Sequence, residues 1–288
     1  MASIIEFQQS DIEVGSLLGT GGFSTVHSVD LSYMKLAEID DYLAEQEKSF
    51  SQTVQQTSPE QQMTRRLNFR DSSEATLEAC YHAEKAHVVK RLKPSLKSLP
   101  PHVQEMAAED LKHEVKLLSE LSSHPNIVTI YGVSSNFWEA PEKGFLCLER
   151  LVEPLDKALA KWKKEASSGI KILTRRHLAQ ELQAKRIQDV AIPVARAMAF
   201  LHDHNIIFRD LKPGNCGFGT AGIIRLFDFG FARRIDPKKT EDYKLTGHIG
   251  TLRYMAPEVA SSEHYGFPAD VHSFAMLLWE LCTLQKPF

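Results

Sequence analysis

The eight residues "FRDLKPGN", 208–215, decide how the rest of this sequence is interpreted. They place an arginine, an aspartate, a lysine and an asparagine side by side, while Pro213 and Gly214 prevent a helix from running through them. Such a stretch predicts a rigid loop in which several polar groups are held at fixed mutual positions. Catalysis by positioning and electrostatics needs a loop of this kind.

Composition and charge narrow the class of protein. The chain has 288 residues, of which 43% are hydrophobic and 25% charged, and its formal net charge is −3. These values are typical of a soluble globular protein of one or two domains, and they favour neither a nucleic acid nor a membrane as partner. The four cysteines contain no CxxC pair, and the sequence shows no signal peptide or membrane span. We therefore expect a reduced, cytoplasmic setting.

Two polar insertions interrupt the ordered segments. Residues 12–28 are strand-like on both sides of a glycine cluster, and residues 86–92 form another short apolar strand. The region between them, about residues 31–81, is polar and glutamine-rich, so we expect an insertion that is disordered or loosely helical. A second insertion, about residues 161–186, is strongly basic. It is either a solvated helical segment or a docking patch for an acidic partner.

Two helices are predicted after the basic insertion, at Ile187–Asp203 and Asp270–Leu284. The second is almost wholly apolar, which predicts that it is buried.

The glycine cluster lies in "LGTGGFSTV", residues 18–26. Glycines at 19, 21 and 22 would let the backbone fold tightly and bring N–H groups against phosphate oxygens. Glycine-rich hairpins are common, so this stretch alone predicts either an ordinary hairpin or a phosphate-binding loop. Ser24 stands where a GxGxxG pattern has its third glycine.

Two charged residues are expected on apolar faces. Side chains alternate along a strand, so Lys90 shares the inward face of its strand with Val88. Glu114 lies within an apolar helical stripe that runs from Leu111 to Leu121. If both charges are buried they form an ion pair; each could instead reach water along its own side chain.

A third group of polar residues surrounds "LFDFGFAR", residues 226–233. Asp228 follows an apolar strand and precedes a glycine, and the sequence between it and Asn215 reads as a hairpin. A hairpin would bring these two oxygen ligands together, and Mg²⁺ is a hard cation that takes one or two protein oxygens plus substrate phosphates. The loop at 208–215 would then hold a base, a phosphate-facing cation and a metal ligand for phosphoryl transfer.

Together these motifs resemble the eukaryotic protein kinase catalytic domain, and the segment "DVHSFAMLLWEL", 270–281, is closest to the tyrosine-kinase-like group of serine/threonine kinases. The resemblance implies an α+β, bilobal fold with a β-rich N-lobe containing one main helix and a mainly helical C-lobe. Residues 1–11 would be an N-terminal leader, 12–150 the N-lobe and 151–288 the C-lobe. Because the chain stops just after the helix from Asp270, we expect an incomplete C-lobe, either from a fragment or from a finished protein with a reduced lobe.

The resemblance also implies the nucleotide site. Lys90 would grip the α and β phosphates of ATP with Glu114 as its helix partner, and Leu148 would be the gatekeeper before a hinge at Glu149–Leu151. The residues implied in ATP binding are Leu18, Gly19, Thr20, Gly21, Gly22, Phe23, Ser24, Val26, Val88, Lys90, Glu149 and Leu151.

The same resemblance implies catalytic and regulatory roles. Asp210 would accept the proton of the substrate hydroxyl, Lys212 would neutralise the transferred group, and Asn215 and Asp228 would bind Mg²⁺. Arg209 would pair with a phosphate added to the activation segment by an upstream kinase, and the candidate acceptors are Thr240, Tyr243 and Thr246. Thr251 would be structural, and Glu258 belongs to the "APE" that closes the segment.

The type of kinase follows from the same positions. Lys212 together with "GT" at 250–251 resembles enzymes that phosphorylate serine or threonine in protein substrates, although tyrosine or dual specificity stays open. A kinase-fold scaffold without activity is the alternative, but the groups at 90, 210, 215 and 228 are all intact.

Several positions depart from the family pattern. Phe208 replaces the usual histidine of the HRD motif, where a ring stacks beneath Phe229. His272 replaces a common tyrosine with no clear consequence. At the adenine pocket, Val88 is larger than the usual alanine and Gly217 smaller than the usual leucine, so we expect a neighbouring apolar residue to complete the floor.

Overall fold

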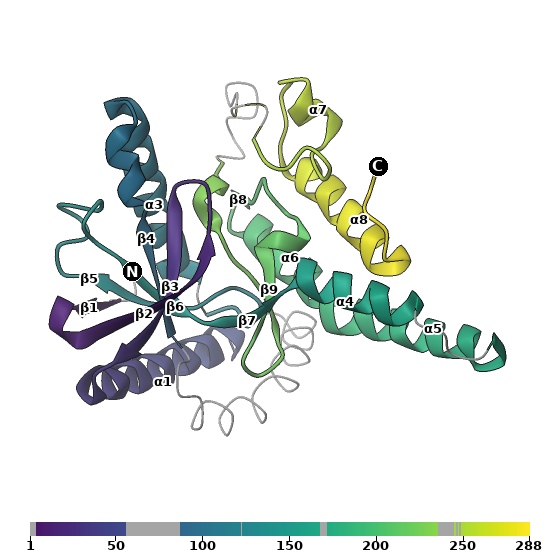
Figure 1. Ribbon diagram of the computed structural model, residues 1–288, viewed down its shortest axis with the longest axis horizontal. Helices are drawn as coiled ribbons and strands as arrows, with labels where there is room; N and C mark the ends of the chain where they lie inside the picture. Colours follow the sequence, from purple (N-terminus) through teal and green to yellow (C-terminus); the bar gives the residue numbers. More distant parts are fainter. Residues whose placement is uncertain are drawn as a thin grey trace. The chain divides into compact units, whose positions relative to one another are not determined.

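The computed structural model describes residues 4–55, 87–121, 123–167, 172–235, 245, 247 and 249–288. The chain divides into two compact units, Met1–Arg150 and Leu151–Phe288, and Figure 1 labels the helices and most of the strands of both. The first unit is built on a β-sheet, whereas the described part of the second is mostly helical.

A six-stranded sheet forms the first unit, with the strand order β1-β5-β6-β4-β3-β2. Its strands are β1 (Ile5–Phe7), β2 (Ile12–Thr20), β3 (Ser24–Leu31), β4 (His87–Leu92), β5 (Ile130–Ser134) and β6 (Leu146–Glu149). The neighbouring strands from β2 to β5 pair antiparallel, and β1 joins the edge of the sheet parallel to β5.

Strand β1 corrects the prediction that residues 1–11 are a leader outside the domain. Ile5 is paired with Gly132 of β5, and Phe7 is fully buried. A Cβ atom at Gly132 would lie only 1.9 Å from the carbonyl oxygen of Ile5, so a glycine is needed for the two backbones to approach this closely. The strand is too short to leave a periodic signal in the sequence.

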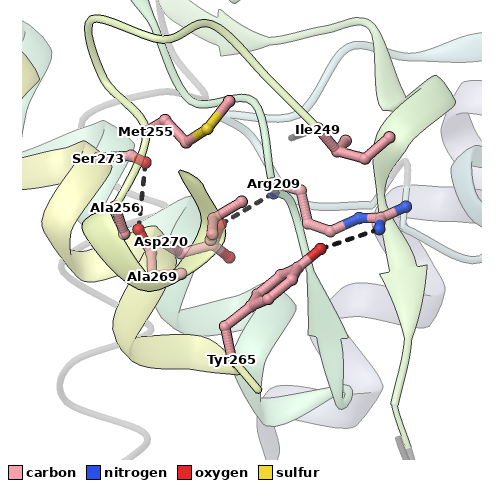
Figure 2. A pocket seen from close by; sticks show the side chains of 9 residues that line it. Arg209, Ile249, Met255, Ala256, Tyr265, Ala269, Asp270 and Ser273 are labelled. Atoms are coloured by element: carbon pink, nitrogen blue, oxygen red, sulfur yellow. Dashed lines mark hydrogen bonds between the residues drawn. The ribbon is translucent and has the colours of Figure 1, made fainter. Parts of the chain in front are cut away.

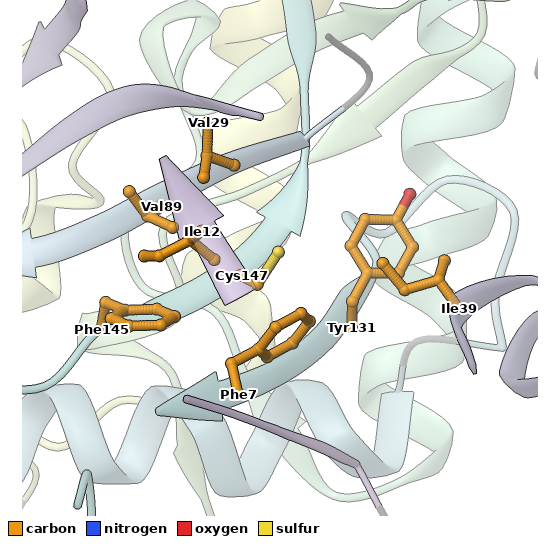
Figure 3. Packing of buried hydrophobic residues seen from close by; sticks show 8 residues of the cluster. All are labelled: Phe7, Ile12, Val29, Ile39, Val89, Tyr131, Phe145 and Cys147. Carbon is orange, nitrogen blue, oxygen red and sulfur yellow. The ribbon is translucent and has the colours of Figure 1, made fainter. Parts of the chain in front are cut away.

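Helix α1 (Tyr33–Gln55) corrects the interpretation of the first insertion, because it is a regular helix attached to the sheet. Its Ile39 packs with Phe7, Val29, Val89 and other apolar residues in the core drawn in Figure 3. The amino group of Lys35 donates to the carbonyl oxygen of Glu6 at 3.0 Å and so ties the helix to the end of β1. The remaining part of this insertion lies outside the described residues.

Helix α3 (Pro101–Leu121) is the second long helix of the first unit. It buries the predicted apolar stripe, and Glu114 is buried within it. A short 3₁₀ turn, η2 (Pro94–Ser98), precedes the helix and follows β4.

The described part of the second unit contains two small sheets, ordered β10-β9-β7 and β11-β8. The strands are β7 (Leu151–Pro154), β8 (Ile206–Ile207), β9 (Cys216–Gly219), β10 (Ile224–Leu226) and β11 (Arg233–Arg234). The helices are α4 (Leu155–Ser167), α5 (Ile172–Arg186), α6 (Ile192–Asp203), α7 (Pro257–Ala260) and α8 (Phe267–Thr283). A π-helical turn, η3 (Ile187–Ala191), leads into α6, so the predicted helix at Ile187–Asp203 is present with a wider first turn.

The described part of the basic insertion and the apolar helix predicted from the sequence are both helical in this unit. The basic insertion starts inside α4, where Lys161 and Lys164 are exposed, and continues through α5. The helix expected to be buried, α8, is buried along one face only, because Val271 is 58% exposed and Trp279 is 41% exposed. Its buried face includes two carboxylates, those of Asp270 and Glu280.

Candidate active site

Lys90 and Glu114 form a buried ion pair in the first unit. Val89 of β4 belongs to the core drawn in Figure 3, and because side chains alternate along a strand, its neighbour Lys90 lies on the opposite face. The register of the sheet pairs Lys90 with Leu146 of β6. The Lys90 amino group lies 2.8 and 2.7 Å from the two carboxylate oxygens of Glu114. Lys90 is 8% exposed and Glu114 2%, so neither side chain reaches into water as the alternative interpretation allowed.

The glycine cluster forms the turn between β2 and β3. Thr20 pairs with Thr25, and the amide of Gly21 donates to the carbonyl oxygen of Ser24 at 2.9 Å. A Cβ atom at Gly19 or at Gly22 would meet no atom within 4 Å, so the fold itself does not require these glycines. Open space over a bare backbone turn is what a bound phosphate would need.

Lys93, just after β4, ties the tip of this hairpin back to the sheet. Its amide donates to the carbonyl oxygen of Phe23 at 2.8 Å, and its amino group donates to that of Gly22 at 3.0 Å. Phe23 at the tip is 38% exposed.

The predicted gatekeeper and the start of the hinge lie on β6. Leu148 pairs with Val88 of β4 on one side and with Ile130 of β5 on the other. The amide of Glu149 donates to the carbonyl oxygen of Thr129 at 2.9 Å, which fixes the end of the strand.

Leu151 begins β7 in the second unit and pairs with Gly219 of β9. Its side chain lies against Gly217, where an added Cβ atom would come within 3.1 Å of Leu151 Cδ1. Leu151 therefore occupies the space beside Gly217, which lacks a side chain of its own.

The loop after β8 holds Asp210 in a network of hydrogen bonds. Asp210 Oδ2 accepts from Lys212 Nζ at 2.7 Å and from Asn215 Nδ2 at 2.8 Å. Asp210 Oδ1 accepts from the hydroxyl of Thr251 at 2.9 Å. The Lys212 amino group also donates to the Thr251 hydroxyl, at 2.8 Å. The structure thus brings together four of the predicted site residues, although Thr251 is 41 positions from Asp210.

The backbone at residue 250, just before Thr251, requires a glycine. Its φ is 109°, a conformation that favours glycine, and a Cβ atom there would lie 2.6 Å from the carbonyl oxygen of Arg209. Any other residue would push Thr251 away from the catalytic loop.

Asp270, near the start of α8, holds the backbone of the same loop through hydrogen bonds. Its carboxylate accepts hydrogen bonds from the backbone amides of Phe208 at 2.8 Å and Arg209 at 2.9 Å. Its Oδ2 also lies 2.9 Å from Nε2 of His202 on α6. These contacts hold Arg209 at a φ of 71°, which is rare for a residue with a side chain.

The hairpin β9–β10 brings Asn215 and Asp228 to the same end, as the sequence predicts. Cys216 pairs with Leu226, and the amide of Phe227 donates to the carbonyl oxygen of Asn215 at 3.0 Å. Asp228 follows directly, with a left-handed φ of 65°. Burial raises the pKa of the Cys216 thiol, so this cysteine between the two remains neutral.

Phe208 contacts Phe229 as expected, with ring centroids 5.1 Å apart in an edge-to-face arrangement. The aromatic ring therefore fills the place of the usual histidine.

The activation segment is described only in part. The predicted phosphorylation sites Thr240, Tyr243 and Thr246 lie outside the described residues. Glu258 lies in α7 and is half-buried.

Sequence reasoning missed three residues that support the site: His202, Gly250 and Tyr265. The "GT" motif at 250–251 indicates substrate class and a structural role for Thr251, and a glycine beside such a threonine is also a signal of a close backbone approach. His202 and Tyr265 act through contacts over long sequence separations, and nothing in their local sequence reveals them.

Comparison with known proteins identifies the family. The family model of the protein kinase domain matches residues 73–288, more than half of the chain. The chain therefore belongs to the protein kinase domain family, and the resemblance drawn from its motifs is confirmed.

The curated relatives fall in the same family. Serine/threonine-protein kinase VIK of Arabidopsis thaliana is 33% identical over 205 residues, which cover 69% of this chain and 41% of that protein. Serine/threonine-protein kinase STY17 of Arabidopsis thaliana is 42% identical over 99 residues, 34% of this chain and 17% of that protein. Dual specificity protein kinase shkB of Dictyostelium discoideum is 29% identical over 202 residues, 70% of this chain and 28% of that protein. The matches thus span less than half the length of each relative.

The described residues form neither a membrane span nor a cluster of metal-binding side chains. None of their helices is long and apolar enough to cross a membrane. They also contain no group of three or more His, Cys, Asp or Glu side chains that could hold a metal ion.

Proposed function

We propose that this chain is an ATP-dependent protein kinase that transfers the γ-phosphoryl group to serine or threonine hydroxyls of protein substrates. The observation that carries the proposal is the network in which Asp210 is held by Lys212, Asn215 and Thr251. The names of the relatives VIK and STY17 support serine/threonine specificity, whereas that of shkB keeps dual specificity open.

Asp210 would act as the base that orients the substrate hydroxyl. Its Oδ2 atom already accepts two hydrogen bonds, and its Oδ1 atom accepts one from Thr251. A carboxylate oxygen has two lone-pair sites, so Oδ1 retains one for an incoming hydroxyl. The proton of that hydroxyl would pass to Oδ1 as the hydroxyl oxygen bonds to the γ-phosphorus of ATP. The bond from that phosphorus to the β,γ-bridging oxygen would break, ADP would leave with the bonding electrons, and Lys212 would offset the charge on the transferred group.

Lys90 would bind the phosphates of ATP in the first unit. Its pairing with both oxygens of Glu114 fixes the amino group. In the sheet, Lys90 is paired with Val26 of β3, which is paired in turn with Gly19 of β2. The backbone of the glycine turn between β2 and β3 would contact the phosphates, while Leu18, Val26 and Val88 would contact the adenine. In the second unit, Leu151 fills the space beside Gly217 and would be the apolar residue that replaces the missing side chain there.

Asn215 and Asp228 fit a Mg²⁺ ion by the chemistry of their donors. The side-chain nitrogen of Asn215 donates a hydrogen bond to Asp210, so the side-chain oxygen of Asn215 is the atom that would bind the metal ion. Asp228 lies at the same end of the β9–β10 hairpin. When bound, the ion would neutralise charge on the phosphates. Its binding can be measured without turnover, by Mn²⁺ paramagnetic resonance with wild type and Asp228→Ala.

The transfer itself is tested with γ-³²P-labelled ATP and a generic basic protein substrate. We expect label on phosphoserine or phosphothreonine after acid hydrolysis of the product. The Lys90→Met variant should lose most of the transfer, because it removes charge stabilisation that is realised in the transition state. Label found on tyrosine alone would contradict the proposed specificity, and a Lys90→Met rate close to wild type would contradict the role of Lys90.

A further inference from the structure

Arg209 is fixed at its backbone. Its φ of 71° lies in the left-handed region, and its amide is held by Asp270 Oδ1 at 2.9 Å. The residue is 9% exposed, so its guanidinium is turned into the protein. Because Asp210 is the next residue, the backbone conformation of Arg209 helps to set the position of the proposed base.

The guanidinium of Arg209 joins two further segments. Its Nε donates to the carbonyl oxygen of Phe231 at 2.6 Å, which holds the 3₁₀ turn η5 (Phe229–Phe231) that follows Asp228. Its Nη1 donates to the hydroxyl of Tyr265 at 3.2 Å, the bond drawn between these residues in Figure 2. One side chain thus links the catalytic loop, the start of the activation segment and the residues before α8.

Tyr265 is well placed to hold the guanidinium still. Its ring packs on a small buried cluster of Ala256, just before α7, Val259 in α7 and Ala269 in the first turn of α8. Figure 2 shows its hydroxyl directed toward the guanidinium across a small pocket. The ring is therefore anchored on helices, while its polar end reaches the catalytic loop.

We propose that Tyr265 is a positioning residue that orders Arg209, and through it Phe231 and Asp210. The Tyr265 hydroxyl and the Phe231 carbonyl oxygen would hold the Arg209 guanidinium in the chain before any residue is phosphorylated. The inference rests on the proposed kinase function and deepens its regulation. A phosphate on the activation segment would then strengthen an arrangement that already exists. Without the Tyr265 hydroxyl, the guanidinium would lose one of its anchors and the catalytic loop would be less ordered.

The test compares wild type, Tyr265→Phe and Tyr42→Phe, all fully dephosphorylated as verified by mass spectrometry. Tyr265→Phe keeps the packed ring and removes only the hydroxyl. Tyr42→Phe is the matched control, because the buried Tyr42 hydroxyl has no partner among the described residues. For Tyr265→Phe we expect kcat to fall about tenfold with KM for ATP within about twofold of wild type, because the lost bond holds a charged group that positions the base. The control should match wild type.

A second readout does not depend on turnover. The Nε–H resonance of Arg209, assigned with Arg209→Lys, should be protected from solvent exchange in wild type and exchange faster in Tyr265→Phe. An unchanged resonance, or a kcat equal to that of Tyr42→Phe, would overturn the inference. So would a wild type that is inactive until phosphorylated, although the proposed function would survive that result. The two proposals can also fail separately. If the Arg209 resonance exchanges faster in Tyr265→Phe but wild type transfers no phosphate under any condition, the ordering of Arg209 by Tyr265 is supported and the proposed kinase function is overturned.

Discussion

The polar residues of the candidate site are brought together partly by short-range and partly by long-range contacts in the chain. Asp210, Lys212 and Asn215 are close in sequence, and one loop holds them in hydrogen-bonding distance. Lys90 and Glu114 come from different elements, and the sequence pattern left open whether they pair or each reaches water. The structure shows the pair.

Gly217 gives a prediction at the residue scale. A Cβ atom there would lie 3.1 and 3.3 Å from atoms of Leu151 and 3.4 Å from Phe227, so there is no room for a larger side chain. Gly217→Leu should overpack this region and weaken ATP binding by about 1–3 kcal/mol. Isothermal titration calorimetry with ATP measures this, and equal or tighter binding would show that Leu151 does not fill the floor of the pocket.

His87 gives a second prediction at this scale, on the pH dependence of stability. Burial lowers its pKa to about 4, and its ring packs on Tyr131 at 4.9 Å. Above pH 6.5, about the pKa of histidine in the unfolded chain, His87 is neutral in both the folded and the unfolded protein, so its ionisation does not change the free energy of unfolding. As the pH falls from 6.5 toward 4 the unfolded chain takes up the proton first, so the free energy of unfolding decreases by up to about 1.4 kcal/mol per pH unit.

Urea unfolding of wild type and His87→Phe between pH 7 and 4 tests the pH prediction. The variant should show a flatter dependence over this window. Identical slopes for the two proteins would mean that His87 is not buried in its neutral form.

Among the helices and strands, two elements of the first unit were not predicted from the sequence as regular parts of the sheet unit: strand β1 and helix α1. Strand β1 has three residues, too few for a periodic pattern. The sequence of α1 is mostly polar, and among its residues whose side chains the structure describes, Ile39 and Tyr42 are buried. Its composition therefore indicated loose structure, whereas packing against the sheet determined the outcome. The strands and helices that carry dense apolar patterns, such as β4 and α3, were predicted correctly.

Two positions of α1 test whether the helix is part of the core. Ile39 is 3% exposed and packs in the cluster of Figure 3, whereas Leu36 on the same helix is 38% exposed. Ile39→Ala should lower the free energy of unfolding by about 2–5 kcal/mol, because it leaves a cavity. Leu36→Ala should change it by about 0.5 kcal/mol or less. Chemical denaturation measures both, and equal small losses would show that α1 is not packed on the sheet.

At the scale of the whole molecule, each unit holds its own part of the proposed machinery. The proposed phosphate-binding groups, Lys90 and the glycine turn, lie in Met1–Arg150, while Asp210, Asn215 and Asp228 lie in Leu151–Phe288. Each set is ordered by contacts inside its own unit, such as the Lys90–Glu114 pair and the Asp270 support. A change in one set should therefore leave the other intact.

The central claim is that Asp210 is the catalytic base of an active kinase and not a remnant in an inactive scaffold. It is tested most directly by the transfer of ³²P from γ-labelled ATP to a basic protein substrate, comparing purified wild type with Asp210→Asn. Asparagine keeps the shape of the side chain and removes the carboxylate, so we predict clear transfer by wild type and a kcat lower by about 10²–10⁴-fold in the variant. Equal rates for the two proteins, or no transfer by either, would contradict the account.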